Sequence, residues 1–393
     1  MRGVVLLQFG QFDHINVFDH VVVPKLVKRR ALLIKVVAAS LSGLDVKSMR
    51  GEFWMMSKVP MIPGCDFAGI VVGIGQACSG RFKEGDFVFG ATRFVGGAMA
   101  EYVVCLEEWV APLPNGVPFH IAAALPTAML AAYQGLAQAN VKAGERVLVL
   151  GGSGGIGHFA VQIAVHLGAV VSATCSGANA DFVRSLGAHN VIDYQTQQWW
   201  APIGETQAAA QPSSLQHIYD VIFDTVGADR TYEMASQVLS HGGRLLTVSV
   251  GTPELSSSRV AALSGAFLKH KLWSLVSGPA YYFINVQISD EDLLACCQLV
   301  QQGVVVPHLG RVLQFTQSDV QQAISTLASG RARGKLVVQI APETTTGVDA
   351  LSEYARLVST VTSCTDPAGC ACEQPSESLV AAQPPVLPAD DQP

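Results

Sequence analysis

A chain of 393 residues is too long for one ordinary hydrophobic core, and it predicts two domains. A hydrophobic content of 49% with only 14% charged residues is typical of a well-buried globular protein rather than a disordered one. The formal net charge of −6, with no basic cluster denser than "KLVKRR" (25–30), argues against a nucleic-acid binder.

Short β-runs punctuated by Gly and Pro fill the first part of the chain. They include "ALLIKVVAASL" (31–41), "AGIVVGIG" (68–75), "GDFVFG" (85–90) and "AEYVVCL" (100–106). Strands this short and closely spaced predict a small barrel or a sandwich over residues 1–125.

In "TAMLAAYQGLAQAN" (127–140) the apolar residues recur at helical spacing, which predicts a helix. Predicted strands and helices alternate after it. The predicted strands are 146–151, 169–175, 190–194, 219–227 and 242–250, with helices at 157–168 and 180–188. This alternation predicts a doubly wound parallel sheet over residues 126–265. The longer polar connection 196–217 is interpreted as part helix and part loop.

The chain after residue 265 is predicted to return to the first domain. A helix with apolar positions at 293, 294, 296, 299 and 300 leads to an extended segment. A helix at 318–330 and a closing strand at 334–340 complete this return, 266–340. Residues 341–393 are rich in Thr, Ser, Pro, Ala and acids, and we expect a disordered tail with a short helix at 349–358.

The stretch "VLVLGGSGGIGHFAVQIA" carries the strongest functional signal. Gly152, Gly154 and Gly157 form a G-x-G-x-x-G directly after a buried strand and before a helix. The first glycine permits the tight turn, the second lets the backbone approach a pyrophosphate, and the third lets helix pack on strand. We therefore predict dinucleotide binding, with the anion at the helix N-terminus.

The end of the second strand of this sheet indicates which dinucleotide binds. NAD-binding folds place an acid there to hold the ribose hydroxyls. This strand ends in Cys175 and Ser176, with no acid, and Ser176 can donate to a 2′-phosphate. Arg184 is the nearest following arginine. NADPH is the predicted cofactor.

These motifs resemble the medium-chain dehydrogenase/reductases, and more closely their zinc-free quinone oxidoreductase branch. The resemblance rests on "GCDFAGIVVGIG", "FKEGDFVFG", "GGAMAEYVV", "LGAHNVIDY", "DVIFDTVG" and "GKLVVQI", in the family's order, and covers about residues 3–340. Within the branch, "CSGANADFVRSLGAHNVIDY" (175–194) and "ASGRARGKLVV" (328–338) resemble the reticulon-interacting mitochondrial group.

The resemblance implies an α/β fold: a GroES-like β-barrel catalytic domain, a Rossmann domain with a doubly wound parallel sheet, and an active site in the cleft between them. It also implies further cofactor contacts: Ser153, Gly155 and Ile156 in the loop, Ser176, Tyr194, Thr225, and Arg333, Gly334 and Lys335 at the closing turn.

"PGCDFAG" (63–69) lies where zinc-dependent relatives hold a catalytic metal. Ser42 takes the place of their first cysteine, Cys65 of the histidine and Asp66 of the glutamate, and "LPTAML" offers no third ligand. A catalytic zinc needs three protein ligands and an open fourth position. We expect no metal here, with Cys65 as a packing residue and Asp66 held by hydrogen bonds.

Without a metal, the resemblance favours reduction of an activated acceptor, because hydride from NADPH can reach a quinone or an α,β-unsaturated carbonyl without a Lewis acid. Candidate catalytic residues are Ser42, Asp45, Lys47 and Thr127, with Arg50 also in the cleft; a purely structural role stays open for each. Two alternatives also stay open: a 2-enoyl thioester reductase, although Phe53 replaces that group's proton-donating tyrosine, and an idle NADPH-binding partner protein.

Location and partners follow from weaker signals. Nine scattered cysteines indicate free thiols, and the chain begins with a strand pattern rather than a leader, so we expect a cytoplasmic protein. We expect no membrane span and no nucleic acid, only a small-molecule substrate, and leave a homodimer open.

Overall fold

The computed structural model describes the chain except for residues 11, 28, 53–57, 93–95, 201–217, 228–229, 249–278 and 364–393. The chain divides into two compact units. The first unit comprises Met1–Thr127, Ile288–Gln298 and Leu309–Pro393, and the second comprises Ala128–Gln287 and Leu299–His308.

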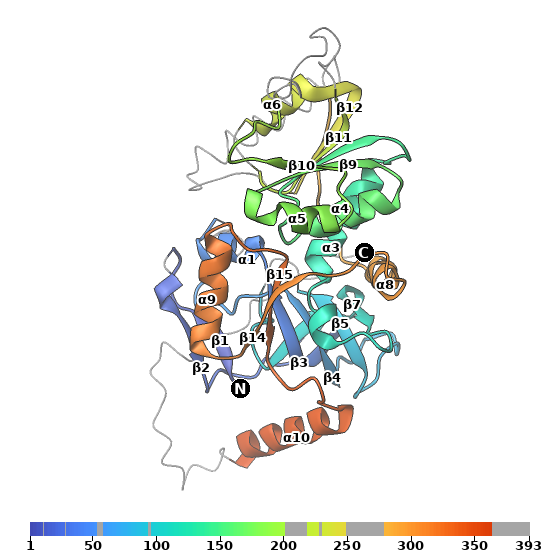
Figure 1. Cartoon of the computed structure of the whole chain (residues 1–393). Helices are drawn as coiled ribbons and strands as arrows, with labels where there is room; N and C mark the ends of the chain where they lie inside the picture. The colour runs from blue at the N-terminus through green and yellow to red at the C-terminus, as the bar shows by residue number, and fades with distance from the viewer. Residues whose placement is uncertain are drawn as a thin grey trace, which may run out of the picture. The chain divides into compact units, whose positions relative to one another are not determined.

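A seven-stranded, mostly antiparallel sheet forms the core of the first unit (Figure 1). Its order is β14-β15-β3-β4-β5-β7, with β6 also paired to β3. The strands are β3 (Ala31–Leu41), β4 (Asp66–Ile74), β5 (Phe87–Ala91), β6 (Tyr102–Leu106), β7 (Val110–Pro112), β14 (Leu309–Gln314) and β15 (Lys335–Gln339). β3 is buried along its whole length, which explains why its sequence is a continuous apolar run. A ribbon of β1 (Gly3–Leu6) and β2 (Ile15–Phe18) completes the described strands of the first unit.

Helices and short turns surround this sheet. The helices are α1 (Gly43–Met49), α2 (Phe119–Ala122), α8 (Asp290–Gln301), α9 (Gln317–Ala328) and α10 (Gly347–Ser363), and α3 (Pro126–Gln138) begins in the first unit and continues into the second. α1 begins at a capping box made by Ser42 and Asp45, and the Thr316 side chain caps α9.

The second unit holds a six-stranded parallel sheet in the order β10-β9-β8-β11-β12-β13. The strands are β8 (Arg146–Leu150), β9 (Val170–Cys175), β10 (Asn190–Asp193), β11 (Tyr219–Asp224), β12 (Leu239–Thr247) and β13 (Ala280–Phe283). α4 (Gly157–His166) and α5 (Ala180–Ser185) cover one face, and α6 (Thr231–Val238) covers the other (Figure 1). This is the strand order of the Rossmann fold, whose ligand site lies where the order reverses beside β8.

β13 is the element of this sheet that the sequence did not predict. The expected return to the first domain began at residue 266, but Ala280–Phe283 still pairs in parallel with β12, from Arg244↔Ala280 to Thr247↔Phe283. The segment is only four residues long, too short for its side-chain alternation to give a usable strand signal.

The C-terminal segment also differs from expectation, because its helix is longer and belongs to the folded body. α10 begins at Gly347 and packs against β4, with Ala350 fully buried. The buried Lys35 ammonium lies 2.5 Å from Glu353 Oε1 and 5.2 Å from the centre of the Tyr102 ring. A carboxylate from the tail therefore neutralises a cation of the sheet. Residues 364–393 lie outside the described residues.

Candidate functional site

The loop between β8 and α4 has two glycines that the fold itself requires. A Cβ on Gly152 would lie 2.8 Å from Ala173 Cβ, and one on Gly157 would lie 2.1 Å from the Gly151 carbonyl oxygen. Gly151 has a φ of +79°, in the left-handed region that favours glycine. These positions let β8, β9 and α4 approach closely.

Gly154 is different, because its outer side is open. A Cβ there would meet only Gly151 O within 4 Å, at 3.2 Å. Ser153, Gly155 and Ile156 share this loop, and Ile156 is the N-cap residue of α4. The first amides of a helix have no intrahelical acceptor and favour an anion. The loop therefore fits a pyrophosphate, with Gly154 leaving room for it.

The turn after β9 lies next to this loop. Ser176 caps the short helix Gly177–Asn179, and Asn179 Nδ2 donates to both Ser176 Oγ at 3.3 Å and Ser153 Oγ at 3.4 Å. Thr225 Oγ1 donates to Leu150 O at 2.7 Å, which places this predicted contact beside the loop. Asn179 was missed from the sequence; its only signal was a polar residue in the turn after the second strand.

A carboxylate also reaches this turn, from the neighbouring strand. Asp193, the last residue of β10, is in register with Cys175, and its Oδ2 lies 2.8 Å from where a Cβ on Gly177 would be. The sequence pattern for an acid applies to the end of β9, so it did not reveal an acid on β10. Tyr194 follows and is 58% exposed. Arg184 is paired with Asp181 Oδ1 at 2.7 Å.

In the first unit, Asp66 is the centre of a buried polar cluster. It accepts four hydrogen bonds: from Lys335 Nζ (3.1 Å), Ser40 Oγ (3.1 Å), Thr127 Oγ1 (2.8 Å) and the Thr127 amide (3.1 Å). Asp66 and Lys335 are 1% and 2% exposed. The predicted residues Thr127 and Lys335 thus meet on one carboxylate, and the Lys335 ammonium is engaged in an ion pair.

Asp45 organises a second carboxylate site beside the first. Its Oδ2 accepts from the Ser42 amide (2.7 Å) and hydroxyl (2.8 Å), and its Oδ1 accepts from the Gly64 amide (3.0 Å). Burial, and then the charge of Asp66, raise the pKa of Asp45, and the hydrogen bonds from Ser42 oppose this. Ser42 is half-buried, and so is Lys47 on the same helix.

Cys65 lies between these two carboxylates. Burial raises the pKa of its thiol well above the usual range, and the charges of Asp45 and Asp66 raise it further. The protonated thiol is a poor metal ligand. Among the described residues, no three His, Cys, Asp or Glu side chains gather at metal-binding distance. Phe53 lies outside the described residues.

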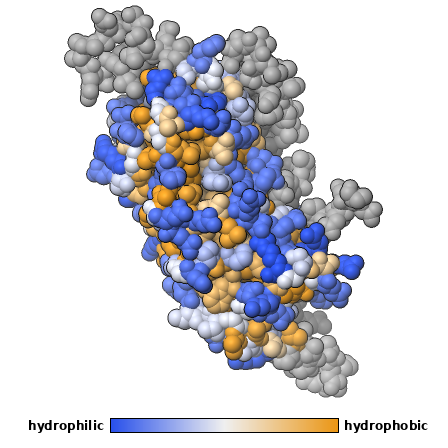
Figure 2. All heavy atoms as spheres, turned by 90° about the vertical axis from the view of Figure 1, so that its right-hand side faces the viewer, coloured by the Kyte–Doolittle hydropathy of each residue, from blue (hydrophilic) through white to orange (hydrophobic). Residues whose placement is uncertain are grey.

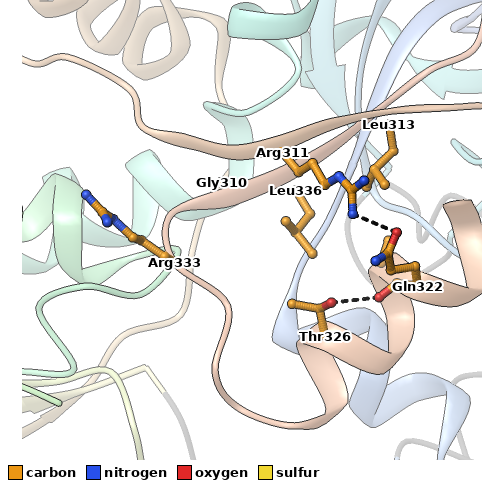
Figure 3. Close-up of a pocket in the computed structure, with 8 residues that line it drawn as sticks. Gly310, Arg311, Leu313, Gln322, Thr326, Arg333 and Leu336 are labelled. Carbon is orange, nitrogen blue, oxygen red and sulfur yellow. Dashed lines mark hydrogen bonds between the residues drawn. The ribbon is translucent and has the colours of Figure 1, made fainter. Parts of the chain in front are cut away.

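Arg333 and Gly334 form the turn before β15, at the edge of a shallow pocket between β14 and α9 (Figure 3). Its apolar floor includes Leu313 and Leu336, and Arg311 donates to Gln322 Oε1 at 2.6 Å across its rim. Figure 3 shows the Arg333 side chain pointing away from this pair. Arg50, the remaining candidate, lies over the Phe12 ring at 5.7 Å. The candidate residues therefore form two groups, one on each unit.

Comparison with known proteins gives two family matches. Residues 28–115 match the family described as "Alcohol dehydrogenase GroES-like domain", and residues 186–338 match that described as "Zinc-binding dehydrogenase". Among curated proteins, the chain is 33% identical to 2-methylene-furan-3-one reductase of Solanum lycopersicum and 32% identical to an NADPH-dependent alkenal/one oxidoreductase, chloroplastic, of Arabidopsis thaliana. Each match covers 87% of this chain and 80% of the relative.

Solved structures show the same fold. The quinone oxidoreductase from Coxiella burnetii matches with a TM-score of 0.71 and 28% identity, over 86% of this chain and 99% of that one. The Escherichia coli quinone oxidoreductase complexed with NADPH matches with a TM-score of 0.68 and 19% identity, over 86% of this chain and 100% of that one. The finer likeness to the reticulon-interacting group stays a prediction. In the described part of the chain, no helix is both long and apolar enough to cross a membrane.

Proposed function

The chain belongs to the medium-chain dehydrogenase/reductase superfamily, and from this membership we propose that it transfers hydride from NADPH to a quinone or an α,β-unsaturated carbonyl. One observation carries the proposal: the chain matches an NADPH-dependent alkenal/one oxidoreductase along 80% of that relative's length and keeps an open glycine loop.

NADPH is the cofactor, and it supplies the hydride when bound. The Gly154 backbone and the α4 N-terminus are assigned to the pyrophosphate, with Ser153, Gly155 and Ile156 completing the loop. Ser176 and Asn179 are assigned to the adenosine 2′-phosphate, because both present polar groups at the turn after β9. Tyr194, Thr225, Arg333, Gly334 and Lys335 stay proposed contacts at the periphery of the cofactor.

The reaction is proposed to be independent of zinc. Burial raises the pKa of the Cys65 thiol, which disfavours the thiolate form, and Asp66 already accepts from an ammonium, two hydroxyls and an amide. The chain instead supplies orientation, exclusion of water and hydrogen-bond donors. Asp45 and Asp66 act as positioning residues, because Ser42 Oγ donates to Asp45 and Thr127 Oγ1 donates to Asp66. We assign these two hydroxyls and Lys47 to the acceptor oxygen, to which each hydroxyl donates only after it turns from its carboxylate.

A homodimer through β13 is part of the proposal. β13 is the last strand in the pairing order of the second unit, and Phe283 on it is 40% exposed. Figure 2 shows hydrophobic residues on both halves of the face it presents. An open strand edge is a template for pairing with another chain. If β13 pairs, Phe283→Glu should lower the mass measured by light scattering from dimer to monomer.

We also place the protein in the cytoplasm. The six described cysteines are all free thiols, as expected in a reducing compartment. At least three relatives have chloroplastic in their names, so the location needs a direct test. Fractionation of the source cells, with the protein recovered in an organelle fraction, would contradict this placement.

A screen of NADPH oxidation tests the central proposal. Steady-state rates are measured with simple quinones, enones and a 2-enoyl-CoA, with NADH in parallel. Turnover with a quinone or an enone supports the proposal. A preference for enoyl-CoA supports the thioester reductase alternative, which a 30% identical trans-enoyl reductase of Aspergillus terreus also favours. Tight NADPH binding without turnover of any acceptor supports the idle partner protein.

A further inference from the structure

Asp193 places a carboxylate at the Ser176–Gly177 turn from β10, whereas NAD-binding folds supply this acid from the end of the second strand, here β9. Parallel pairing puts Asp193 beside Cys175, one residue before Ser176. The backbone amide of Gln195 donates to Oδ1 at 3.0 Å. Among the described residues, Oδ2 accepts no hydrogen bond, and it lies 2.8 Å from the position of a Cβ on Gly177. One carboxylate oxygen is therefore available directly over the Ser176–Gly177 turn.

The surrounding charges do not cancel this carboxylate. Arg184, the cation whose charge acts on Cys175, is tied to Asp181, whose side chain is fully exposed. Burial raises the pKa of the Cys175 thiol, and the charge of Asp193 raises it further, in the opposite sense to Arg184. No described lysine, arginine or histidine is within salt-bridge distance of Asp193.

We propose that Asp193 is a specificity-determining residue, which weakens binding of the 2′-phosphate and offers an acceptor to the ribose 2′-hydroxyl of NADH. This inference rests on the proposed cofactor site. Asn179 Nδ2 donates to the Oγ atoms of Ser176 and Ser153, which leaves the Ser176 hydroxyl hydrogen to donate to a phosphate. The Asp193 carboxylate instead repels a phosphate and accepts from a hydroxyl. The preference for NADPH over NADH is thus set by the balance between two opposed contributions to binding. Ser176, after β9, favours the 2′-phosphate, and Asp193, on β10, disfavours it.

Asp193→Asn is the direct test, because the amide keeps the Oδ1 acceptor for Gln195, removes the charge and replaces the acceptor Oδ2 with an NH2 donor. Affinities for NADPH, NADH, 2′,5′-ADP and 5′-AMP are measured by titration calorimetry. We expect NADPH and 2′,5′-ADP to bind roughly five- to tenfold tighter, with NADH and 5′-AMP unchanged or weaker. The nucleotide fragments carry no hydride, so this readout is independent of turnover.

Glu233→Gln is the matched control, since Glu233 is an exposed carboxylate on α6 and its loss changes the net charge equally. It should leave all four affinities unchanged. If Asp193→Asn alters NADPH and NADH by the same factor, or alters neither, the assignment of Asp193 is wrong. If the wild-type chain binds neither NADPH nor 2′,5′-ADP, the cofactor site itself is wrong, which is a separate failure of the proposed function.

Discussion

Asp66, a buried carboxylate of the first unit, shows how much one side chain can depend on its partner. Lys335→Met would leave Asp66 with its two hydroxyl donors and one amide but no cation, inside a site that is 1% exposed. A buried charge that loses its partner costs about 3–5 kcal/mol of folding free energy. The double variant Asp66→Asn/Lys335→Met should recover a large part of that loss. Urea unfolding of the wild type and the variants measures this; equal losses in the single and double variants would contradict it.

The glycines of the loop should separate fold from function. Gly154→Val should lower the unfolding midpoint much less than Gly152→Val, because its Cβ meets a single described atom, Gly151 O at 3.2 Å. It should abolish NADPH binding by filling the space for the pyrophosphate. Gly152→Val should instead destabilise the protein, because the side chain would collide with Ala173. Thermal unfolding and NADPH fluorescence titration, run on both variants, test this contrast. Retained NADPH binding by Gly154→Val would move the cofactor elsewhere.

The residue at position 176 should determine whether the protein prefers NADPH or NADH. Ser176→Asp adds a charge beside the 2′-phosphate, a like-charge cost of about 1–3 kcal/mol if the site is partly desolvated. NADPH binding should weaken roughly ten- to a hundredfold while NADH binding stays the same or improves. Fluorescence titration of both cofactors measures this. Equal losses for NADPH and NADH would show that Ser176 does not face the 2′-phosphate.

Because α10 packs on the first unit, the stability of a C-terminally truncated chain should depend on whether the truncation removes this helix. A chain ending at residue 341 should lose stability by roughly 1–3 kcal/mol, because Lys35 loses its carboxylate and the apolar face under α10 becomes exposed. A chain ending at residue 363 should match the full chain. The melting temperatures of both, with Glu353→Gln as a third variant, measure this. Two truncations with equal stability would show that α10 contributes nothing.

The elements also show what a sequence reveals. β3 was predicted at its observed limits, because eleven buried residues give an uninterrupted apolar run. The parallel order of five strands and the glycine loop followed from local pattern as well. α6 and β13 are short and gave no such pattern. Asp193 and the Asp66–Lys335 pair could not be found locally, because their partners come from other strands, in the second case 269 positions away.

For the molecule as a whole, the set of possible metal ligands predicts how much zinc the purified protein contains. The purified full-length protein should contain no stoichiometric zinc, since Ser42 replaces a ligating cysteine, Asp66 is ion-paired with Lys335, and no three metal-binding side chains gather among the described residues. Elemental analysis by mass spectrometry measures this, with Cys65→Ala as the matched variant. One tightly held zinc per chain that disappears in Cys65→Ala would refute zinc independence.

The position of β15 has a consequence for how the protein is made. β3 and β4 belong to the first third of the chain, yet the strand that flanks β3 and the ammonium that neutralises Asp66 are synthesised near its end. During synthesis, the edge of β3 that pairs with β15 and the carboxylate of Asp66 have no partner until Lys335–Gln339 is made. The second unit can already fold at that stage. Because Lys335–Gln339 is synthesised late, the first unit is completed only when this strand pairs with β3, about 300 positions earlier in the chain. Until then the nascent chain is exposed to aggregation.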